Sequence, residues 1–231
     1  MCGRKTLSMS KREIIEQLMV DEWQVEDYTP SYNIAPTQNS VVMVQERGYN
    51  IVRSMRWGLI PAWSKNKLYG SKMINARIET VTTKPSFKNL IPKNRCIVLS
   101  DGYYEWKQSG DKKVPFFIQK KDGGPMLFAG LWNTWSISSK RIATYTILTT
   151  KSQGDVSAIH DRMPILLDKS KVEMWSNLDN QFSEIQQELS KFKYKFSYYQ
   201  VSDFVNTPKN NSMACIAPFK TPLNLNLFEE S

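Results

Sequence analysis

The sequence predicts an α+β fold: a single domain built on a curved, mostly antiparallel, barrel-like β-sheet with short flanking helices. Three observations support this prediction. Strand-like segments dominate the middle of the chain, the helical patterns are short, and no linker rich in proline, glycine or serine divides the 231 residues. A chain of this length fits one large domain, so we assign residues 1–231 to it, with a loop-like tail after about residue 218.

A helix over about residues 11–19 is the first predicted element. Ser10 and Glu13 form a capping box ahead of the apolar stretch IIEQLMV. Short runs rich in β-branched and aromatic residues then predict strands. These strands are expected at 41–45, 50–56, 95–99, 103–106, 114–120, 126–131 and 143–149.

Turn residues separate several of these elements. A turn near Gly48 divides 41–45 from 50–56, and the KDGG sequence between 114–120 and 126–131 predicts a hairpin. Beyond the strands, the pattern changes to helices near 155–159, 168–176 and 181–190, then to a strand over 194–201 and a loop over 206–212.

Composition excludes several classes of protein. The 27 aromatic residues and plentiful β-branched residues argue against disorder. The longest apolar run, 126–132, is far shorter than the roughly 18 residues that span a bilayer. The N-terminus lacks the apolar core of a signal peptide. We therefore expect a cytoplasmic protein without membrane association, and we expect it to be a monomer.

The counts of charged residues and potential metal ligands narrow the possible partners. Thirty-one Lys and Arg against 22 Asp and Glu leave a net charge of +9, which is compatible with a nucleic-acid partner or simply with a basic surface. The three cysteines, Cys2, Cys96 and Cys215, are widely spaced and odd in number, which argues against a disulfide framework. With one histidine and no CxxC, we expect no metal site, and the absence of a nucleotide-binding loop motif leads us to expect no cofactor.

Cys2 is the first candidate for chemistry because of its position. Removal of Met1 would leave a 1,2-aminothiol, whose α-amine has an ordinary pKa of about 7.7–8.0. Such an amine condenses with an aldehyde to a Schiff base, and the adjacent thiol can then close a five-membered thiazolidine. The alternative is an ordinary cysteine that happens to follow the start methionine.

Two titratable residues are further candidates. His160, in IHDRMP, is the only side chain whose unperturbed pKa lies near neutrality, although it is also compatible with a structural role. Glu105, in SDGYYEWK, would share a strand face with Tyr103 and lie among aromatic residues. Partial burial would raise its pKa and make it a general acid; the alternative is a carboxylate paired at a strand edge.

Two further motifs contain polar or aromatic residues that could bind a phosphate or stack on a base. Asn75 and Arg77, in INARIET, would share one face of an extended segment, where Arg77 offers a fork suited to phosphate. Trp57 and Trp63 bracket RWGLIPAW and are compatible with a platform for unpaired bases or with a core and a tight turn.

Taken together, the ordered motifs resemble the SRAP family, the SOS response-associated peptidases, which are regarded as abasic-site processing proteins. The resemblance spans most of the chain. It is carried by CGR (2–4), YNIAPT (32–37), RWGLIPAW (56–63), INARIET (74–80), RCIVLSDGYYEWK (95–107), PFFIQ (115–119), FAGLW (128–132), TILTT (146–150), IHDRMP (159–164) and VSDFVN (201–206).

The resemblance implies a covalent cross-link between the protein and abasic sites in single-stranded DNA. Cys2 would form the thiazolidine with the open-chain sugar, Glu105 would promote ring opening, and His160 would stabilise or turn over the Schiff base. Asn75 matches a pocket residue near the cross-link. The matched DNA-facing positions are Arg4, Arg77, Arg162, Trp57, Trp63 and Pro36. One departure is visible after Trp63, where SKNKLYGSK stands in place of a second aromatic residue found in some relatives.

Two other functions fit the same residues. In one, Cys2 and His160 form the nucleophile and base of a thiol peptidase, including one that removes only its own Met1. In the other, the protein binds single-stranded nucleic acid without chemistry, and its affinity depends on salt.

Overall fold

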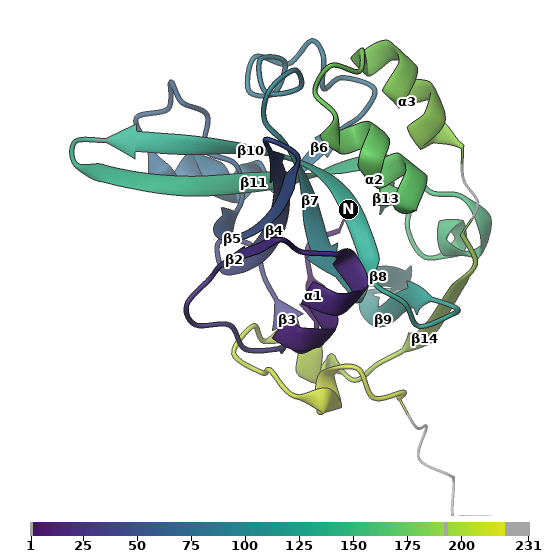
Figure 1. Cartoon of the computed structure of the whole chain (residues 1–231). Helices are drawn as coiled ribbons and strands as arrows, with labels where there is room; N and C mark the ends of the chain where they lie inside the picture. Colours follow the sequence, from purple (N-terminus) through teal and green to yellow (C-terminus); the bar gives the residue numbers. More distant parts are fainter. Residues whose placement is uncertain (1, 192–193, 220–231) are drawn as a thin grey trace, which may run out of the picture.

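A closed β-barrel forms the centre of the protein in the computed structural model, which describes residues 2–191 and 194–219 (Figure 1). Its strands pair in a ring, and a parallel pairing of the last with the first closes it. In ring order they are β11 (Lys140–Lys151), β10 (Met126–Ile137), β7 (Arg95–Ser100), β4 (Asn39–Glu46) and β5 (Tyr49–Trp57).

A second, five-stranded sheet lies beside the barrel. Its strands are, in spatial order, β14 (Phe196–Gln200), β9 (Lys112–Lys120), β8 (Gly102–Ser109), β1 (Lys5–Leu7) and β3 (Ser31–Ile34). Strand β8 follows β7 after a single residue, so the chain passes from the barrel into this sheet almost without interruption. The N-terminal strand β1 is thereby placed between β8 and β3.

Short strands extend the barrel sheet at its margins. These are β2 (Glu22–Gln24) on β5, β6 (Asn75–Arg77) and β12 (Arg162–Pro164) on β11, and β13 (Leu166–Leu167) on β10. Strand β11 therefore carries both β6 and β12. It thereby supports Asn75, which lies on β6, and His160, which lies two residues before β12.

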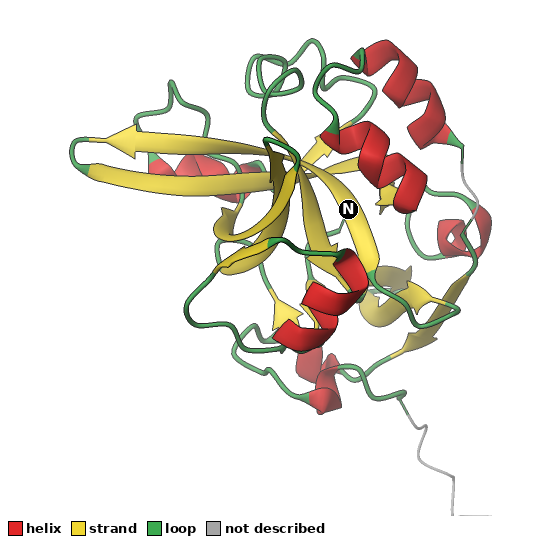
Figure 2. Ribbon diagram, in the orientation of Figure 1, coloured by secondary structure: helices red, strands yellow, loops and turns green. Residues whose placement is uncertain are grey.

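Helices lie around the outside of the sheets (Figure 2). They are α1 (Lys11–Leu18), α2 (Lys169–Ser176) and α3 (Phe182–Ser190), with 3-10 helices η1 (Lys67–Lys72), η2 (Gly154–Ala158), η3 (Asp203–Asn206) and η4 (Met213–Cys215). In the described part of the chain, no helix is both long and apolar enough to cross a membrane.

Most of the buried apolar residues form one cluster that fills the barrel and underlies the helices, and a smaller second cluster packs beneath η3 and η4. The alternation of side chains along β8 divides them between the two clusters. Tyr103 belongs to the large cluster, whereas Tyr104 and the partly buried Trp106 belong to the small one. The same alternation places Glu105 on the face of Tyr103, where its side chain is buried.

The predicted elements are largely confirmed. Helix α1 begins after Ser10, and both hydrogen bonds of the capping box with Glu13 are present. The turn between β4 and β5 places Arg47 at φ 52° and Gly48 at φ 84°, as a two-residue hairpin with the native strand twist requires. The helix expected at 155–159 is the 3-10 helix η2. Most of the predicted tail lies outside the described residues.

The hairpin predicted at KDGG is wrong. Strand β9 pairs with β8 and β14, whereas β10 pairs with β7, β11 and β13, so the two strands belong to different sheets. Gly123, at φ 71°, lets the chain turn sharply there. The KDGG sequence does mark a change of chain direction, but long-range pairing gives each strand different neighbours.

Gly58, directly after β5, is required by a close approach of two backbones. Its φ is 112°, and a Cβ at this position would lie 2.4 Å from the carbonyl oxygen of Gly70. We expect Gly58→Ala to destabilise the protein by about 3 kcal/mol or more, because backbone strain and steric overlap add. Gly48→Ala is the matched control: its φ is 84° but the space is open, so about 1–2 kcal/mol is expected. Urea denaturation of both variants measures the difference; equal losses would contradict the steric part.

Candidate functional site

Cys2 lies in the interior, just before β1, and has no exposed surface. On β6, Asn75 Nδ2 donates a hydrogen bond to the carbonyl oxygen of Cys2 at 2.7 Å. This bond ties the N-terminal segment to the edge of the barrel. Burial raises the pKa of the Cys2 thiol well above its usual value, and the charge of Glu105 raises it further. Cys2 therefore lies in contact with Asn75 and within electrostatic range of Glu105.

Glu105 reaches the same region from the second sheet. In the antiparallel pairing of β8 with β1, Lys5 lies opposite Tyr103, and the N–H of Tyr104 donates to the carbonyl oxygen of Arg4 at 2.9 Å. Extending this register brings Glu105 level with the segment around Cys2. The Glu105 side chain is buried, and burial raises the pKa of its carboxyl group to about 7. Near neutral pH it is therefore present in both the acid and the carboxylate form.

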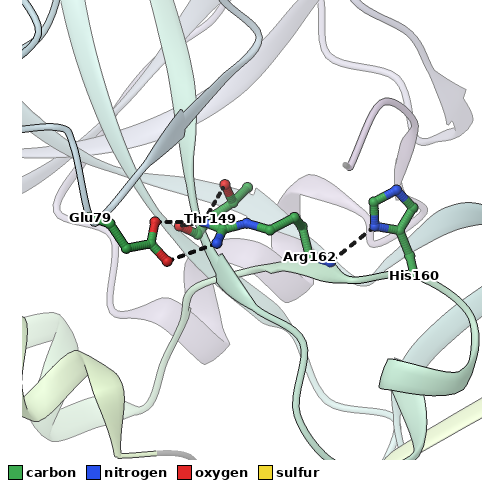
Figure 3. Close-up of polar contacts among 4 residues, drawn as sticks. All are labelled: Glu79, Thr149, His160 and Arg162. Atoms are coloured by element: carbon green, nitrogen blue, oxygen red, sulfur yellow. Dashed lines mark hydrogen bonds and ion pairs between the residues drawn. The ribbon is translucent and has the colours of Figure 1, made fainter.

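His160 follows η2 and is partly exposed. Its Nδ1 accepts a hydrogen bond from the backbone N–H of Arg162 at 3.0 Å (Figure 3). Asp161 Oδ1 lies 2.8 Å from the same nitrogen, a contact that favours a protonated ring. Burial lowers the pKa of the imidazole, and the charge of Asp161 acts in the opposite direction.

Arg162 holds this part of the site together. Its Nη1 and Nη2 donate to the two carboxylate oxygens of Glu79 at 2.7 and 2.9 Å, and Nη2 also donates to the carbonyl oxygen of Thr149 at 2.7 Å (Figure 3). The pair joins β12 to β11 and to the segment that follows β6. Because His160 and Asn75 lie on the two joined segments, this network fixes their relative positions.

Buried polar atoms without partners surround Cys2. Asn75 Oδ1 and the Tyr103 hydroxyl are buried and have no hydrogen-bond partner among the described residues. The Tyr103 hydroxyl is close enough to Glu105 and Cys2 for their charges to raise its pKa, after burial itself. Leaving such atoms unpaired costs free energy, and native proteins tolerate this mainly where function requires it. The two atoms offer an acceptor and a donor to a polar ligand at Cys2.

Trp57 does not lie at the surface, where the expected contact with DNA would place it. It is completely buried, it stacks on Tyr145, and its Nε1 donates to the carbonyl oxygen of Ile74 at 3.0 Å. A side chain in this position is part of the barrel core and cannot stack on a nucleobase. RWGLIPAW was compatible with a stacking platform or with a core and a tight turn; its first tryptophan belongs to the core.

The arginines expected at phosphates divide into two groups. Arg4 is buried, and its Nη1 donates to Asn33 Oδ1 and to the carbonyl oxygen of Val205. Arg162 is equally buried and is occupied by Glu79. Both guanidinium groups thus have internal partners, and their contact with phosphate stays a prediction. Arg77, on β6 two residues from Asn75, is exposed.

Trp63 remains available at the surface, with 57% of its area exposed. The ring of Tyr69 meets it edge-on, with centroids 5.3 Å apart. The loop that carries Trp63 is anchored on the long β10–β11 arm, where Trp135 Nε1 donates to the carbonyl oxygen of Ser64. Pro36, between β3 and β4, is partly buried. Tyr69 therefore supplies an aromatic partner for Trp63 in the segment where the sequence departs from some relatives.

Glu79, Tyr69 and Lys5 were not among the residues predicted from the sequence. Glu79 lies in INARIET, two residues after Arg77, so strand alternation was the available signal for its role. Tyr69 contacts Trp63 through the turn of η1, which has no sequence signature of its own. Lysine is usually a surface residue, but the Lys5 side chain is fully buried.

Comparison with known proteins gives a consistent result. The sequence profile described as SOS response associated peptidase (SRAP) matches residues 1–208. "Abasic site processing protein YoqW" of Bacillus subtilis (strain 168) is 42% identical, over 92% of this chain and 97% of its own. "Abasic site processing protein YedK" of Escherichia coli (strain K12) is 31% identical, over 94% of this chain and 100% of its own.

Solved structures have the same fold. A crystal structure of a protein from Bacteroides thetaiotaomicron superposes with a TM-score of 0.82 at 27% identity, covering 93% of this chain and 98% of that one. In this chain, the barrel and the second sheet together bring Asn75 and Glu105 to Cys2.

Proposed function

Because the chain belongs to the SOS response associated peptidase (SRAP) family, we propose that it processes abasic sites in single-stranded DNA by forming a covalent cross-link through Cys2. The observation that carries this proposal is the environment of Cys2. The second residue of the chain is held in the interior by Asn75, beside a carboxyl group whose pKa is about 7. Relatives named abasic site processing proteins support the same substrate.

The chemistry begins with removal of Met1, which frees the amine of Cys2. An abasic sugar exists mostly as a closed hemiacetal. Protonated Glu105 donates a proton to the ring oxygen, the bond from that oxygen to the anomeric carbon breaks, and the anomeric hydroxyl loses its proton to water as the aldehyde forms. The free amine adds to the aldehyde carbon, water leaves, and a Schiff base forms. The thiol then attacks the imine carbon to close a thiazolidine. Closure removes the imine that would otherwise promote β-elimination and strand breakage.

Asn75 and His160 have supporting tasks in this scheme. Asn75 positions the carbonyl group of Cys2 and leaves its own Oδ1 free to accept from a sugar hydroxyl. His160 can exchange a proton with the Schiff base or with the sugar. The Arg162–Glu79 pair keeps His160 and Asn75 in register.

Arg77 and Trp63 form the DNA-facing part of the proposal. An exposed guanidinium two residues from Asn75 is suited to a phosphate next to the abasic sugar. Trp63, supported by Tyr69, offers a ring on which an unpaired base can stack. The net charge of +9 favours association with a polyanion.

Replacing Arg77 with alanine should weaken DNA binding and reduce its salt dependence. Loss of one phosphate contact lowers the slope of log K against log salt by about 0.7 for a single strand. Arg12→Ala is the matched control, because Arg12 is an exposed arginine on α1 that pairs with Glu16. Titrating fluorescent single-stranded DNA at several salt concentrations measures both slopes. If the Arg77→Ala slope equals that of Arg12→Ala, Arg77 does not contact phosphate.

The decisive experiment mixes the protein with single-stranded DNA containing one abasic site. Intact mass first establishes that Met1 is absent. A heat- and SDS-stable adduct of the expected mass supports cross-linking. Salt-dependent binding without any adduct would instead indicate a binding module, and cleavage of a peptide panel would indicate a thiol peptidase.

A further inference from the structure

Lys5, the first residue of β1, is buried with no exposed surface. Its Nζ donates to Ser40 Oγ on β4 and to the carbonyl oxygen of Leu99 on β7, both at 2.8 Å. No ion pair among the described residues includes Lys5. An amine buried without a carboxylate partner costs free energy, because its charged form loses hydration that no counter-ion replaces. Its position in the core therefore calls for a functional explanation.

The surroundings of Lys5 connect it to the site. Lys5 follows Cys2 by three residues and lies opposite Tyr103, whose buried hydroxyl has no partner among the described residues. The other facing groups from β3, β4 and β7 carry no charge. The charges that act on Lys5 are those of Asp101, in the turn after β7, and of Cys2, just before β1. Glu105 on β8 acts on Cys2, and Cys2 in turn acts on Tyr103 on β8 and Tyr145 on β11.

We propose that the buried amine of Lys5, in its ammonium form, assists thiazolidine closure by stabilising the thiolate of Cys2. Lys5 does not contact the DNA; it is a positioning residue that acts through the Cys2 sulfur. This role rests on the proposed cross-linking function, because it concerns the second half of that reaction.

The step that Lys5 assists is the attack of sulfur on the protonated Schiff base. The Cys2 thiol releases its proton to water. The resulting thiolate forms the sulfur–carbon bond, and the electron pair of the C=N bond moves onto the nitrogen, which becomes a neutral secondary amine. No oxidant or reductant takes part. The negative charge on sulfur before attack is the charge that a nearby ammonium group stabilises.

The electrostatics show why such help is needed. Burial and then the charge of Glu105 raise the pKa of the Cys2 thiol, and Lys5 opposes both. Burial lowers the pKa of Lys5 itself to about 7, while the charges of Asp101 and Cys2 act in the opposite direction. A thiolate at Cys2 therefore favours the ammonium form of Lys5, and the two charges stabilise each other at neutral pH.

The test separates the two halves of the reaction. Borohydride traps the Schiff base, whereas the heat-stable adduct formed without reductant reports ring closure. In Lys5→Met we expect the rate of unreduced adduct formation at pH 7 to fall about tenfold, as a change of one pKa unit in the thiol implies. The rate should recover as the pH is raised toward 9, and the borohydride-trapped rate should stay at the wild-type level.

Two further variants exclude a purely structural effect. Lys5→Gln retains a hydrogen-bond donor for Ser40 and Leu99 without the charge, so it should behave like Lys5→Met. Lys171→Met removes another buried lysine, which donates from α2 to the carbonyl oxygen of Lys191 at 2.6 Å. This control should change stability alone and leave the pH profile of ring closure unchanged.

The outcomes distinguish this proposal from the proposed function. If wild-type protein lacking Met1 forms no adduct, the cross-linking function itself is wrong. If wild-type protein forms the adduct but Lys5→Gln closes the ring at the wild-type rate with the wild-type pH profile, only the role of Lys5 is overturned. An equal loss of both trapped and unreduced products in both Lys5 variants would assign Lys5 a structural role and also overturn the proposal.

Discussion

Cys2→Ala is expected to abolish the heat- and SDS-stable adduct with abasic single-stranded DNA. The variant keeps a small second residue, so Met1 is still removed and a free α-amine remains. It lacks the sulfur that closes the ring, so only a reversible Schiff base can form. We therefore expect no unreduced adduct on a denaturing gel, while borohydride still traps a product. This contrast identifies the sulfur, rather than the amine, as the source of stability.

Cys96→Ala is the matched control for Cys2→Ala. Cys96 is also a free, buried cysteine, and burial raises the pKa of its thiol in the same way. Its replacement removes the same atom from the core of the barrel, so any general loss of stability is comparable. Cys96→Ala should retain the adduct. Persistence of an unreduced adduct in Cys2→Ala would show that another residue forms the cross-link.

Glu105→Gln is expected to slow cross-linking by about 10²–10⁴-fold, the usual contribution of a general acid. The amide cannot donate the proton that opens the sugar ring, whereas the shape of the side chain is preserved. DNA affinity should therefore change little. A stopped-time gel assay gives the rate and a fluorescence titration gives the affinity. Equal losses in rate and affinity would argue that Glu105 supports binding and not acid catalysis.

The pH dependence follows from the same group. With a carboxyl pKa of about 7, the acid form of Glu105 declines as the pH rises through neutrality. The α-amine acts in the opposite sense, because its free-base fraction increases up to about pH 8. The wild-type rate should therefore pass through a maximum between these values. Glu105→Gln should lose the alkaline decline, and Glu46→Gln, a carboxylate on β4 paired with Arg53, should retain it.

The same carboxyl group makes a prediction about stability with a definite sign. Its folded pKa is raised, so its contribution to stability is present at low pH and is lost as the pH rises through about 7. Glu105→Gln should therefore be more stable than wild type above neutral pH, although it is less reactive. This opposition is typical of a group retained for chemistry rather than for folding.

Local patterns were sufficient for most of the regular structure. The Ser10–Glu13 capping box predicted the start of α1, and the apolar runs predicted the long barrel strands. Short strands were missed where pairing partners, rather than their own residues, define them. Strand β6 is three residues long and exists because β11 pairs with it. The failed hairpin at KDGG has the same cause, since pairing across sheets is a long-range choice.

The candidate site was predictable residue by residue but not as a geometry. The position of Cys2 and the aromatic surroundings of Glu105 were visible in the sequence. The exposure of the residues predicted to face DNA was not visible in the sequence. Arg4, Arg162 and Trp57 have the right chemistry for DNA, but they are buried and have internal partners. Whether a side chain faces solvent depends on which elements cover it.

By itself, the sequence determined the chemical groups that this protein can use: one aminothiol precursor, one histidine, and a carboxylate between aromatic residues. Only the tertiary structure decided their charge states. Glu105 becomes an acid with a pKa of about 7, and Lys5 becomes a buried amine, because the barrel and the second sheet exclude water from both. Desolvation depends on contacts between segments far apart in the chain, which no local pattern encodes.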